Sequence, residues 1–245
     1  MADVAIVTGA SRGIGAAVAR LLGANGYRVC VNYRSGRDAA EGVAGDIVRA
    51  GGEALAVQAD VADRDAVVGL FETVDEQLGR VTALVNNAGI HGPRCRVDAL
   101  DLDVLEEVLA VNVVGLVACS QEAVRRMSTR HGGSGGAIVN ISSGAAHIGS
   151  AGDGVQYALS KGAVNSFTIG LSQEVAGEGI RVNAVSPGLT RTDMPGPDAL
   201  ERGPSIIPMG RVGDAEEIAE TVLWLLSDRA SFVAGANIRV AGGRP

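Results

Sequence analysis

The sequence predicts an α/β fold in which helices cover both faces of a doubly wound parallel sheet. Short apolar runs alternate with helical patterns along all 245 residues. These runs are continuous rather than alternating in polarity, which is typical of strands that are buried on both faces. No Pro-, Ser- or charge-rich linker divides the chain. We therefore expect a single domain over residues 1–245.

Each expected element follows from a local pattern. Apolar residues spaced three and four apart predict the helices, and Gly26, Gly51 and Gly79 end the first three. Asp63 is expected to cap one helix, and Asp214 begins another. In chain order, we expect strand 4–7, helix 14–25, strand 28–33, helix 37–50, strand 54–58, helix 63–78, strand 83–85, helix 102–130, strand 136–141, a helix through Tyr157 to about 176, strand 181–185, helix 214–226 and strand 237–240.

Composition excludes several classes of function. Lys plus Arg number 21 against 28 Asp plus Glu, a net charge of −7, so we expect no nucleic-acid partner. No apolar run approaches the ~18 residues of a membrane span. The N-terminus lacks the features of a signal peptide, which predicts a cytoplasmic protein. Cys30, Cys95 and Cys119 are expected to be free thiols, and no cysteine or histidine cluster has metal-binding spacing.

Two stretches stand out for ligand binding. The segment 8–15 is a glycine-rich turn between the first strand and first helix. Such a turn lets the backbone approach a pyrophosphate, which the helix N-terminus favours. The segment 187–211 holds five prolines and is expected to be irregular. A long irregular segment in a compact domain is often functional, so we expect a lid over the substrate.

Tyr157 and Lys161 stand four residues apart in a predicted helix. Residues at this spacing share one helix face, so the phenol and the ammonium converge. A nearby ammonium is expected to lower the pKa of the tyrosine. The pair then has the composition of a general acid and base that works near neutral pH.

The order of further motifs resembles that of the short-chain dehydrogenase/reductase family. Thr8 to Gly15 is similar to the TGxxxGxG turn of that family, and Tyr157-x-x-x-Lys161 matches its YxxxK motif. The other matching positions are Asp60-Val61, Asn86-Asn87-Ala88-Gly89, Asn112, Ser142-Ser143 and Pro187-Gly188. The resemblance covers nearly the whole chain and implies a Rossmann-type fold.

The resemblance implies hydride transfer between a nicotinamide and a carbonyl or alcohol carbon. Tyr157 then transfers the proton, Lys161 lowers its pKa and holds the nicotinamide ribose, and Asn112 supports a proton relay. A serine polarises the substrate oxygen. Ser143 fits this role better than Ser142, although its spacing to Tyr157 is one residue longer than is common in the family. The extra residue is expected in the loop 149–154, and Gln156 is unusual.

Cofactor choice follows from charge at the end of the second strand. No carboxylate lies there to bind the ribose of NAD, whereas Arg34 and Arg12 are suited to the 2′-phosphate of NADP. We therefore expect NADP(H). The expected cofactor contacts are Gly9, Ser11, Arg12, Gly13, Ile14, Gly15, Tyr33, Arg34, Asp60, Val61, Asn87, Ala88, Gly89, Tyr157, Lys161, Pro187, Gly188, Thr190 and Thr192.

Several activities share these motifs. The leading prediction is an NADP(H)-dependent carbonyl reductase or alcohol dehydrogenase that acts on a small molecule. A 3-oxoacyl-carrier-protein reductase and a sugar dehydrogenase of the glucose 1-dehydrogenase type are alternatives. A non-catalytic NADP-sensing regulator is a fourth, which the presence of Tyr157 and Lys161 disfavours. By resemblance we also expect a homotetramer or dimer. His91 and His147 lie near the expected pocket in sequence and are given no catalytic role.

Overall fold

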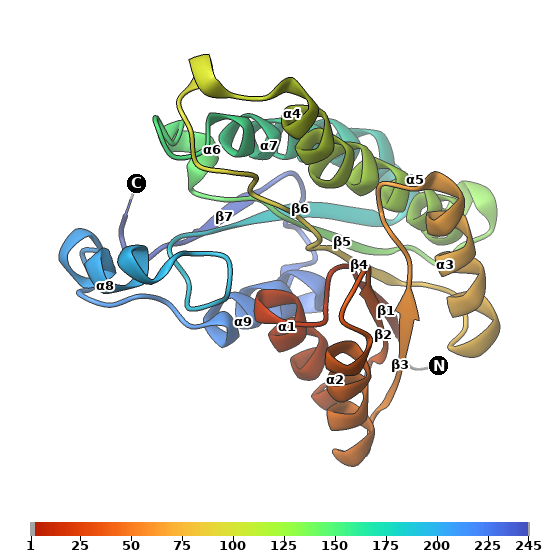
Figure 1. Cartoon of the computed structure of the whole chain (residues 1–245). Coiled ribbons are helices and arrows are strands. Elements are labelled where there is room, and N and C mark those ends of the chain that lie inside the picture. Colours follow the sequence, from red (N-terminus) through yellow and green to blue (C-terminus); the bar gives the residue numbers. More distant parts are fainter. Residues whose placement is uncertain (1–2, 245) are drawn as a thin grey trace.

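The computed structural model describes residues 3–244 and forms a parallel sheet between two layers of helices (Figure 1). Within that range seven strands pair in the order β3-β2-β1-β4-β5-β6-β7. Their bounds are β1 Val4–Val7, β2 Arg28–Tyr33, β3 Glu53–Gln58, β4 Ala83–Asn86, β5 Gly136–Ile141, β6 Ile180–Pro187 and β7 Asn237–Val240. The order reverses between β1 and β4, and ligands of such sheets bind at this switch point. The predicted fold class is confirmed.

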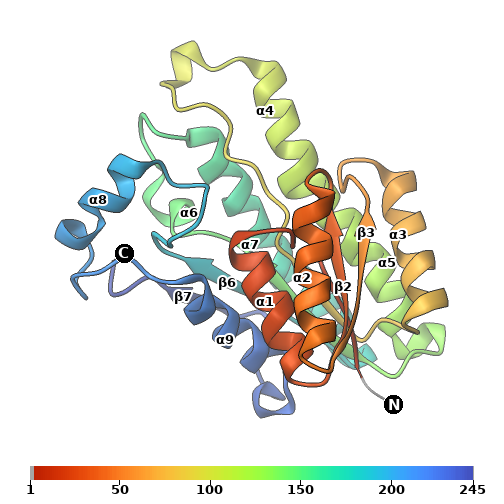
Figure 2. The same cartoon turned by 60° about the horizontal axis from the view of Figure 1, so that its bottom comes forward.

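Helices cover both faces of the sheet, as the view in Figure 2 also shows. The helices are α1 Gly13–Ala24, α2 Arg37–Arg49, α3 Arg64–Gln77, α4 Leu102–Leu109, α5 Leu116–Met127, α6 Ala145–Ile148, α7 Val155–Val175, α8 Pro197–Ile206 and α9 Ala215–Leu226. Short 3₁₀ turns occupy Val97–Ala99, Thr129–His131, Ala176–Glu178 and Asp228–Ala230.

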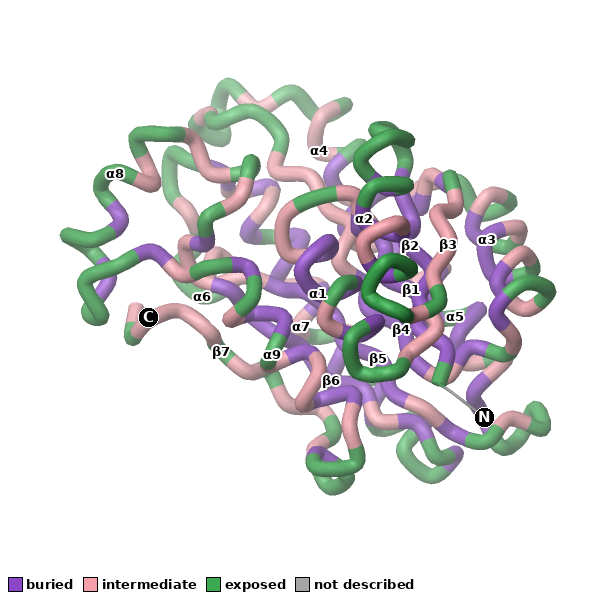
Figure 3. Tube along the Cα trace, turned by 90° about the horizontal axis from the view of Figure 1, so that it is seen from below, coloured by how far each residue is buried: buried purple, intermediate pink, exposed green. Residues whose placement is uncertain are grey.

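Alternate residues of each central strand enter different cores. Ala5 and Val7 of β1 pack with α1, α2 and α9, whereas Val4 and Ile6 pack with α3, α5 and α7. Buried residues are concentrated in the central strands and on the inner sides of the helices (Figure 3). The continuous apolar runs are therefore explained by burial on both faces.

Capping side chains define two helix starts as expected. The Asp63 carboxylate accepts hydrogen bonds from the backbone N–H groups of Asp65 and Ala66, at 2.9 and 3.2 Å. Asp214 and Glu217 form a reciprocal capping box at the start of α9. Both caps satisfy backbone donors that the first helical turn leaves without an intrahelical partner.

Two expectations differ from the structure. The helix expected over 102–130 ends at Met127 and contains a π-helical segment, Ala110–Gly115, between α4 and α5. The stretch 187–211 is not irregular throughout, because α8 occupies Pro197–Ile206. Pro197 stands at the start of α8, where its missing N–H costs nothing, so the prolines misled the prediction. The short helix α6 had no sequence signal.

A chain of hydrogen-bonded, buried polar side chains runs from α5 across β4 and β5 to α7. The Asn86 amide donates to Asn140 at 2.9 Å and to Ser120 at 3.0 Å. The Asn140 amide in turn donates to Thr168 Oγ1 at 2.9 Å. All four side chains are buried, and Ser120 and Thr168 anchor the two ends of the chain by donating to Leu116 O and Val164 O, both at 2.8 Å.

Replacing Asn140 with Ala should therefore be costly. The change leaves Asn86 and Thr168 without their buried partner, and we expect the free energy of unfolding to fall by about 3 kcal/mol. Urea unfolding followed by Trp224 fluorescence measures this loss. Gln173→Ala, which alters an exposed amide on α7, is the control and should change stability little. An equal effect of both variants would contradict the polar chain as a stabilising element.

Candidate active site

The candidate catalytic side chains come from three elements that meet beyond the carboxyl ends of β4 and β5. Ser143 follows β5, and Tyr157 and Lys161 lie in the first two turns of α7. Asn112 lies in the π-helical segment between α4 and α5. The structure therefore brings together four side chains that are widely separated in sequence.

Lys161 is held at the end of β5. Its side chain is only 3% exposed, and Nζ donates a hydrogen bond to the carbonyl oxygen of Ile141 at 2.7 Å. Nζ lies 5.6 Å from the ring centroid of Tyr157. Burial disfavours the ammonium and lowers the pKa of Lys161 to about 8. This amine consequently changes charge close to physiological pH.

The pKa of Tyr157 differs in direction from the sequence-based expectation. Burial of the phenol raises the pKa of Tyr157, and the neighbouring Ser143 hydroxyl opposes that rise. The expected lowering by Lys161 is not found: its Nζ donates to the Ile141 carbonyl and lies 5.6 Å from the centre of the Tyr157 ring. In the structure Tyr157 is thus a neutral phenol, the form that donates a proton.

The two serines after β5 point in different directions. The Ser142 hydroxyl is buried and shares its single proton between Asn165 Oδ1 at 2.5 Å and the Lys161 carbonyl at 3.2 Å. Ser143 is partly exposed, accepts from Ala145 N at 3.1 Å and is close enough to Tyr157 to lower the pKa of its phenol. This arrangement favours Ser143 as the hydroxyl that meets a substrate.

Asn112 is fixed between α7 and the loop after β4. Its amide donates to Ile90 O at 2.9 Å and to Ser160 Oγ at 3.0 Å, and its oxygen accepts from Ile90 N at 2.8 Å. A Cβ at Gly89 would lie 3.3 Å from Asn112 Oδ1 and 3.5 Å from Lys161 Nζ. Asn112 and Lys161 therefore flank the same small space. The π-helical turn that carries Asn112 is a feature often found at functional sites.

The glycine-rich turn is shaped to hold a dinucleotide. Gly9 and Gly13 have φ values of +62° and +55°, and a Cβ at Gly9 would lie 2.9 Å from Ala88 Cα. The start of α1 carries no side-chain cap, so its N–H groups face the turn. Gly15 packs against Asn87: a Cβ at Gly15 would lie only 2.5 Å from Asn87 Nδ2. The residues fit a pyrophosphate at this helix N-terminus.

The two sides of the switch point are joined by side chains. Thr8 Oγ1 accepts from the backbone N–H groups of Asn87 and Ala88, both at 3.0 Å. The Asn87 amide donates to Thr8 O and Gly9 O at 2.9 and 3.0 Å. Asn32, which was not among the expected site residues, accepts from Gly9 N at 3.2 Å. Its only sequence signal is a polar residue in an apolar strand.

The expected 2′-phosphate arginines are exposed and lie near carboxylates. Arg34 lies 4.0 Å from Asp60, and Arg12 lies 3.8 Å from Asp193. Tyr33, at the end of β2, accepts a hydrogen bond from Arg37 at 3.3 Å. These contacts are long or solvent-exposed and leave the guanidinium groups able to turn toward an anion.

The remaining predicted cofactor residues lie around the same edge. Thr192 packs against Gly13, 3.4 Å from the position of a Cβ there, whereas Thr190 is buried and donates to Gly188 O at 3.0 Å. A Cβ at Gly188 would lie only 2.8 Å from Ala241. Val61 packs against Gly115 beside the π-helical segment. Thr192 is therefore better placed than Thr190 to reach the phosphate turn. Ser11 and Ile14 belong to the turn itself, and Pro187 ends β6.

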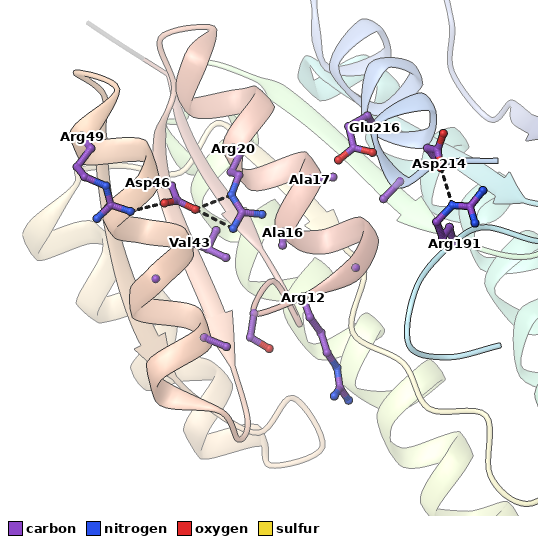
Figure 4. A pocket seen from close by; sticks show the side chains of 15 residues that line it. Arg12, Ala16, Ala17, Arg20, Val43, Asp46, Arg49, Arg191, Asp214 and Glu216 are labelled. Atoms are coloured by element: carbon purple, nitrogen blue, oxygen red, sulfur yellow. Dashed lines mark hydrogen bonds and ion pairs between the residues drawn. The ribbon is translucent and has the colours of Figure 1, made fainter. Parts of the chain in front are cut away.

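A separate groove of about 540 Å³ lies on the outer face of α1, between α2 and α9 (Figure 4). Its charges are largely paired: Asp46 binds Arg20 and Arg49, and Arg191 binds Asp214. Ser143, Tyr157 and Lys161 do not line it. The groove therefore meets the cofactor turn only at its Ser11–Gly13 end.

Neither a spanning helix nor a metal cluster emerges from residues 3–244. No helix in this range is long and apolar enough to cross a bilayer. Groups of three or more His, Cys, Asp or Glu side chains that would hold a metal ion are also absent from it.

Comparison with known proteins agrees with this geometry. A family profile described as enoyl-(acyl carrier protein) reductase matches residues 9–244. The uncharacterized oxidoreductase YgfF of Escherichia coli is 49% identical over 245 residues, covering 98% of this chain and 99% of its own. A 3-oxoacyl-[acyl-carrier-protein] reductase of Synechocystis is 39% identical over 243 residues, covering 99% and 96%.

A solved structure shows the same fold. A short-chain dehydrogenase from Burkholderia cenocepacia in complex with NADP is 35% identical, covers 98% of this chain and 97% of its own, and superposes with a TM-score of 0.92. The profile match, the relatives and this structure lead to one conclusion: the chain belongs to the short-chain dehydrogenase/reductase family of oxidoreductases.

Proposed function

We propose that the protein is an NADP(H)-dependent oxidoreductase that interconverts a carbonyl compound and a secondary alcohol, with Tyr157 as the general acid and base. The observation that carries this proposal is the contact of Tyr157 with Ser143 on one side and its proximity to Lys161 on the other. A neutral phenol beside a second hydroxyl is suited to protonating a carbonyl oxygen as it becomes an alkoxide.

Each side chain has a distinct role in this proposal. The bound nicotinamide supplies or accepts the hydride. Tyr157 donates the proton to the substrate oxygen in reduction and removes it in oxidation, while Ser143 donates a hydrogen bond to the same oxygen. Lys161 holds the ribose hydroxyls and, when charged, stabilises the phenolate left on Tyr157. Asn112, which flanks the same space, supports the path by which a proton returns from solvent.

The choice of NADP(H) over NAD(H) is supported by charge. Strand β2 ends without a carboxylate, Arg12 is an exposed residue of the phosphate turn, and Arg34 is exposed directly after β2. A 2′-phosphate is a stronger partner for a guanidinium than the exposed carboxylates Asp60 and Asp193, because it carries more charge and more acceptors. The Burkholderia relative, which was solved with NADP, adds support.

A 3-oxoacyl-carrier-protein reductase is the second candidate, favoured by the name of the Synechocystis relative. Such an enzyme would offer a basic patch to its acidic carrier protein, and the arginines at the end of α5 and just after it are the candidates, but they are already paired. Arg125 and Arg126 bind Glu122, and Arg130 binds Glu178 at 3.1 Å. This pairing weakens the basic patch and favours a small-molecule substrate.

The surroundings of the site support three further proposals. The segment 187–211, with α8 inside it, acts as the lid that shapes the substrate pocket.

Leu159 and Ile169 of α7 are more than half exposed, and Phe232 is fully exposed. Exposed apolar side chains of this size fit a homotetramer or dimer.

Burial raises the pKa of the Cys30 and Cys119 thiols, which suits a cytoplasmic protein with unreactive free cysteines.

Tyr157→Phe tests the central proposal. The variant keeps the ring but loses the proton, so kcat with the best carbonyl substrate should fall by about 10³-fold. NADPH binding, measured by fluorescence titration, should change less than about threefold. Tyr27→Phe, a half-buried tyrosine at the start of β2, is the control and should keep wild-type kcat. Full activity in Tyr157→Phe would rule out the proposed acid.

The pH dependence of NADPH binding tests Lys161. Because burial lowers the pKa of this amine to about 8, its ammonium form is present below that pH and is lost above it. The Kd for NADPH should therefore rise about tenfold between about pH 7 and about pH 9. Lys161→Met should bind weakly at both pH values without this rise. A flat wild-type curve would show that the charge of Lys161 does not hold the cofactor.

Cofactor preference tests the two arginines. Arg34→Ala and Arg12→Ala each remove a charged donor to the 2′-phosphate, so the KM for NADPH should rise by about tenfold or more. The KM for NADH should change less than about twofold, since NADH lacks that phosphate. Arg229→Ala, an exposed arginine after α9, should change neither. Equal increases for both cofactors would contradict 2′-phosphate recognition.

A further inference from the structure

His91 lies against the ring of Tyr157. The ring centroids are 4.8 Å apart and the planes are tilted by 31°. The Nδ1 atom of His91 lies 3.1 Å from Gly92 O. A carbonyl oxygen only accepts hydrogen bonds, so Nδ1 carries the proton. This bond fixes the orientation of the imidazole over the phenol ring.

Gln156 holds the backbone that carries His91. It immediately precedes Tyr157 on α7, and its side chain is only 1% exposed. The amide donates to His91 O at 3.2 Å and to Pro93 O at 2.9 Å. Its Oε1 is buried and has no hydrogen-bond partner among the described residues. Burying an amide in this way is costly, which indicates that its two bonds to the loop are needed.

The loop before α7 closes around the same imidazole. A Cβ at Gly154 would lie 2.5 Å from Cε1 of His91, so glycine makes room for the ring. The neighbouring Asp153 binds Arg94 at 2.9 Å. Asp153 and Gly154 belong to the loop 149–154, in which the extra residue between Ser143 and Tyr157 is expected. His91 therefore lies between this loop and Tyr157.

We propose that Gln156 and His91 form a positioning pair for Tyr157. Gln156 fixes the segment 91–93, and His91 holds the phenol ring from one face. This pair keeps the Tyr157 hydroxyl directed at Ser143 and limits the side from which a substrate approaches. The inference deepens the proposed function and rests on Tyr157 being its acid and base. It adds two residues that act on the reaction only by positioning Tyr157 and that do not touch the substrate carbonyl.

The first test measures the position of His91 without any turnover. The chain has only 3 histidines, and His131 and His147 are exposed, so the ring-proton NMR spectrum is simple. The His91 ring protons should be shifted upfield by the Tyr157 ring. Gln156→Leu keeps the side-chain size but removes both bonds to the loop. It should move the His91 signals toward those of the exposed histidines and speed tryptic cleavage after Arg94 several-fold.

Gln173→Leu on the exposed side of the same helix is the matched control. It should leave the His91 signals and the rate of cleavage after Arg94 as in the wild type. Unshifted His91 signals in the wild type, or unchanged signals and cleavage in Gln156→Leu, would overturn the pairing. These outcomes are independent of Tyr157 chemistry, which Tyr157→Phe tests separately.

The second test separates positioning from folding. His91→Ala and Gln156→Leu should each lower kcat about tenfold while the Kd for NADPH stays within about twofold. The double variant should lower kcat no further than either single variant, because both changes release the same ring. His91→Phe, which keeps the aromatic contact, should restore most of kcat. Multiplied losses in the double variant, or no rescue by Phe, would overturn the proposal.

Discussion

The hydrogen bond from Lys161 to the end of β5 is the interaction on which the candidate site depends. Lys161 Nζ donates to Ile141 O at 2.7 Å, and the adjacent Ser142 hydroxyl donates back to Lys161 O at 3.2 Å. The two bonds fasten the first turns of α7 to the last residue of the strand and to the residue after it. With that register set, Ser143 and Tyr157 meet, and Lys161 remains close to both. Burying an amine costs stability, and burial lowers the pKa of Lys161 to about 8. A perturbed pKa of this kind is more typical of a functional group than of a structural contact.

Polar side chains inside the core link the same strands to one another by hydrogen bonds. Asn86 and Asn140 link β4 to β5, and Thr168 extends the chain to α7. Thr8 and Asn87 make the corresponding link between β1 and β4, beneath the glycine-rich turn. Thr8 and Asn87 belong to segments that would hold the cofactor, and Asn140 lies three residues before Ser143. The geometry at the switch point therefore rests on buried hydrogen bonds, whose loss is more expensive than that of surface contacts.

Much of this arrangement could be predicted from the sequence, and the exceptions have physical causes. Strands buried on both faces leave continuous apolar runs, so the bounds of β1, β2, β5 and β7 were predicted correctly. The helix α8 was missed because it contains two prolines: Pro197 stands at its start, where a helix tolerates proline, but Pro204 lies inside it. The rise in the Tyr157 pKa was missed because spacing reports which side chains share a face and says nothing of burial. The role of Asn32 depends on contacts across the sheet, which no local pattern encodes.

The substrate side of the site is built differently from the catalytic side. Backbone and buried side chains fix Ser143, Tyr157 and Lys161, whereas the opposite wall consists of loops joined by exposed contacts. Arg94 binds Asp153 of the loop before α7 and lies 3.5 Å from the position of a Cβ at Gly196, beside the start of α8. Exposed ion pairs contribute little stability, so this wall is able to change without disturbing the chemistry. His91 and Gln156 are the points at which the two sides meet, because Gln156 binds the segment 91–93 and His91 lies against the ring of Tyr157. A difference in substrate preference between this chain and its relatives is therefore expected to originate in these loops and to reach Tyr157 through His91.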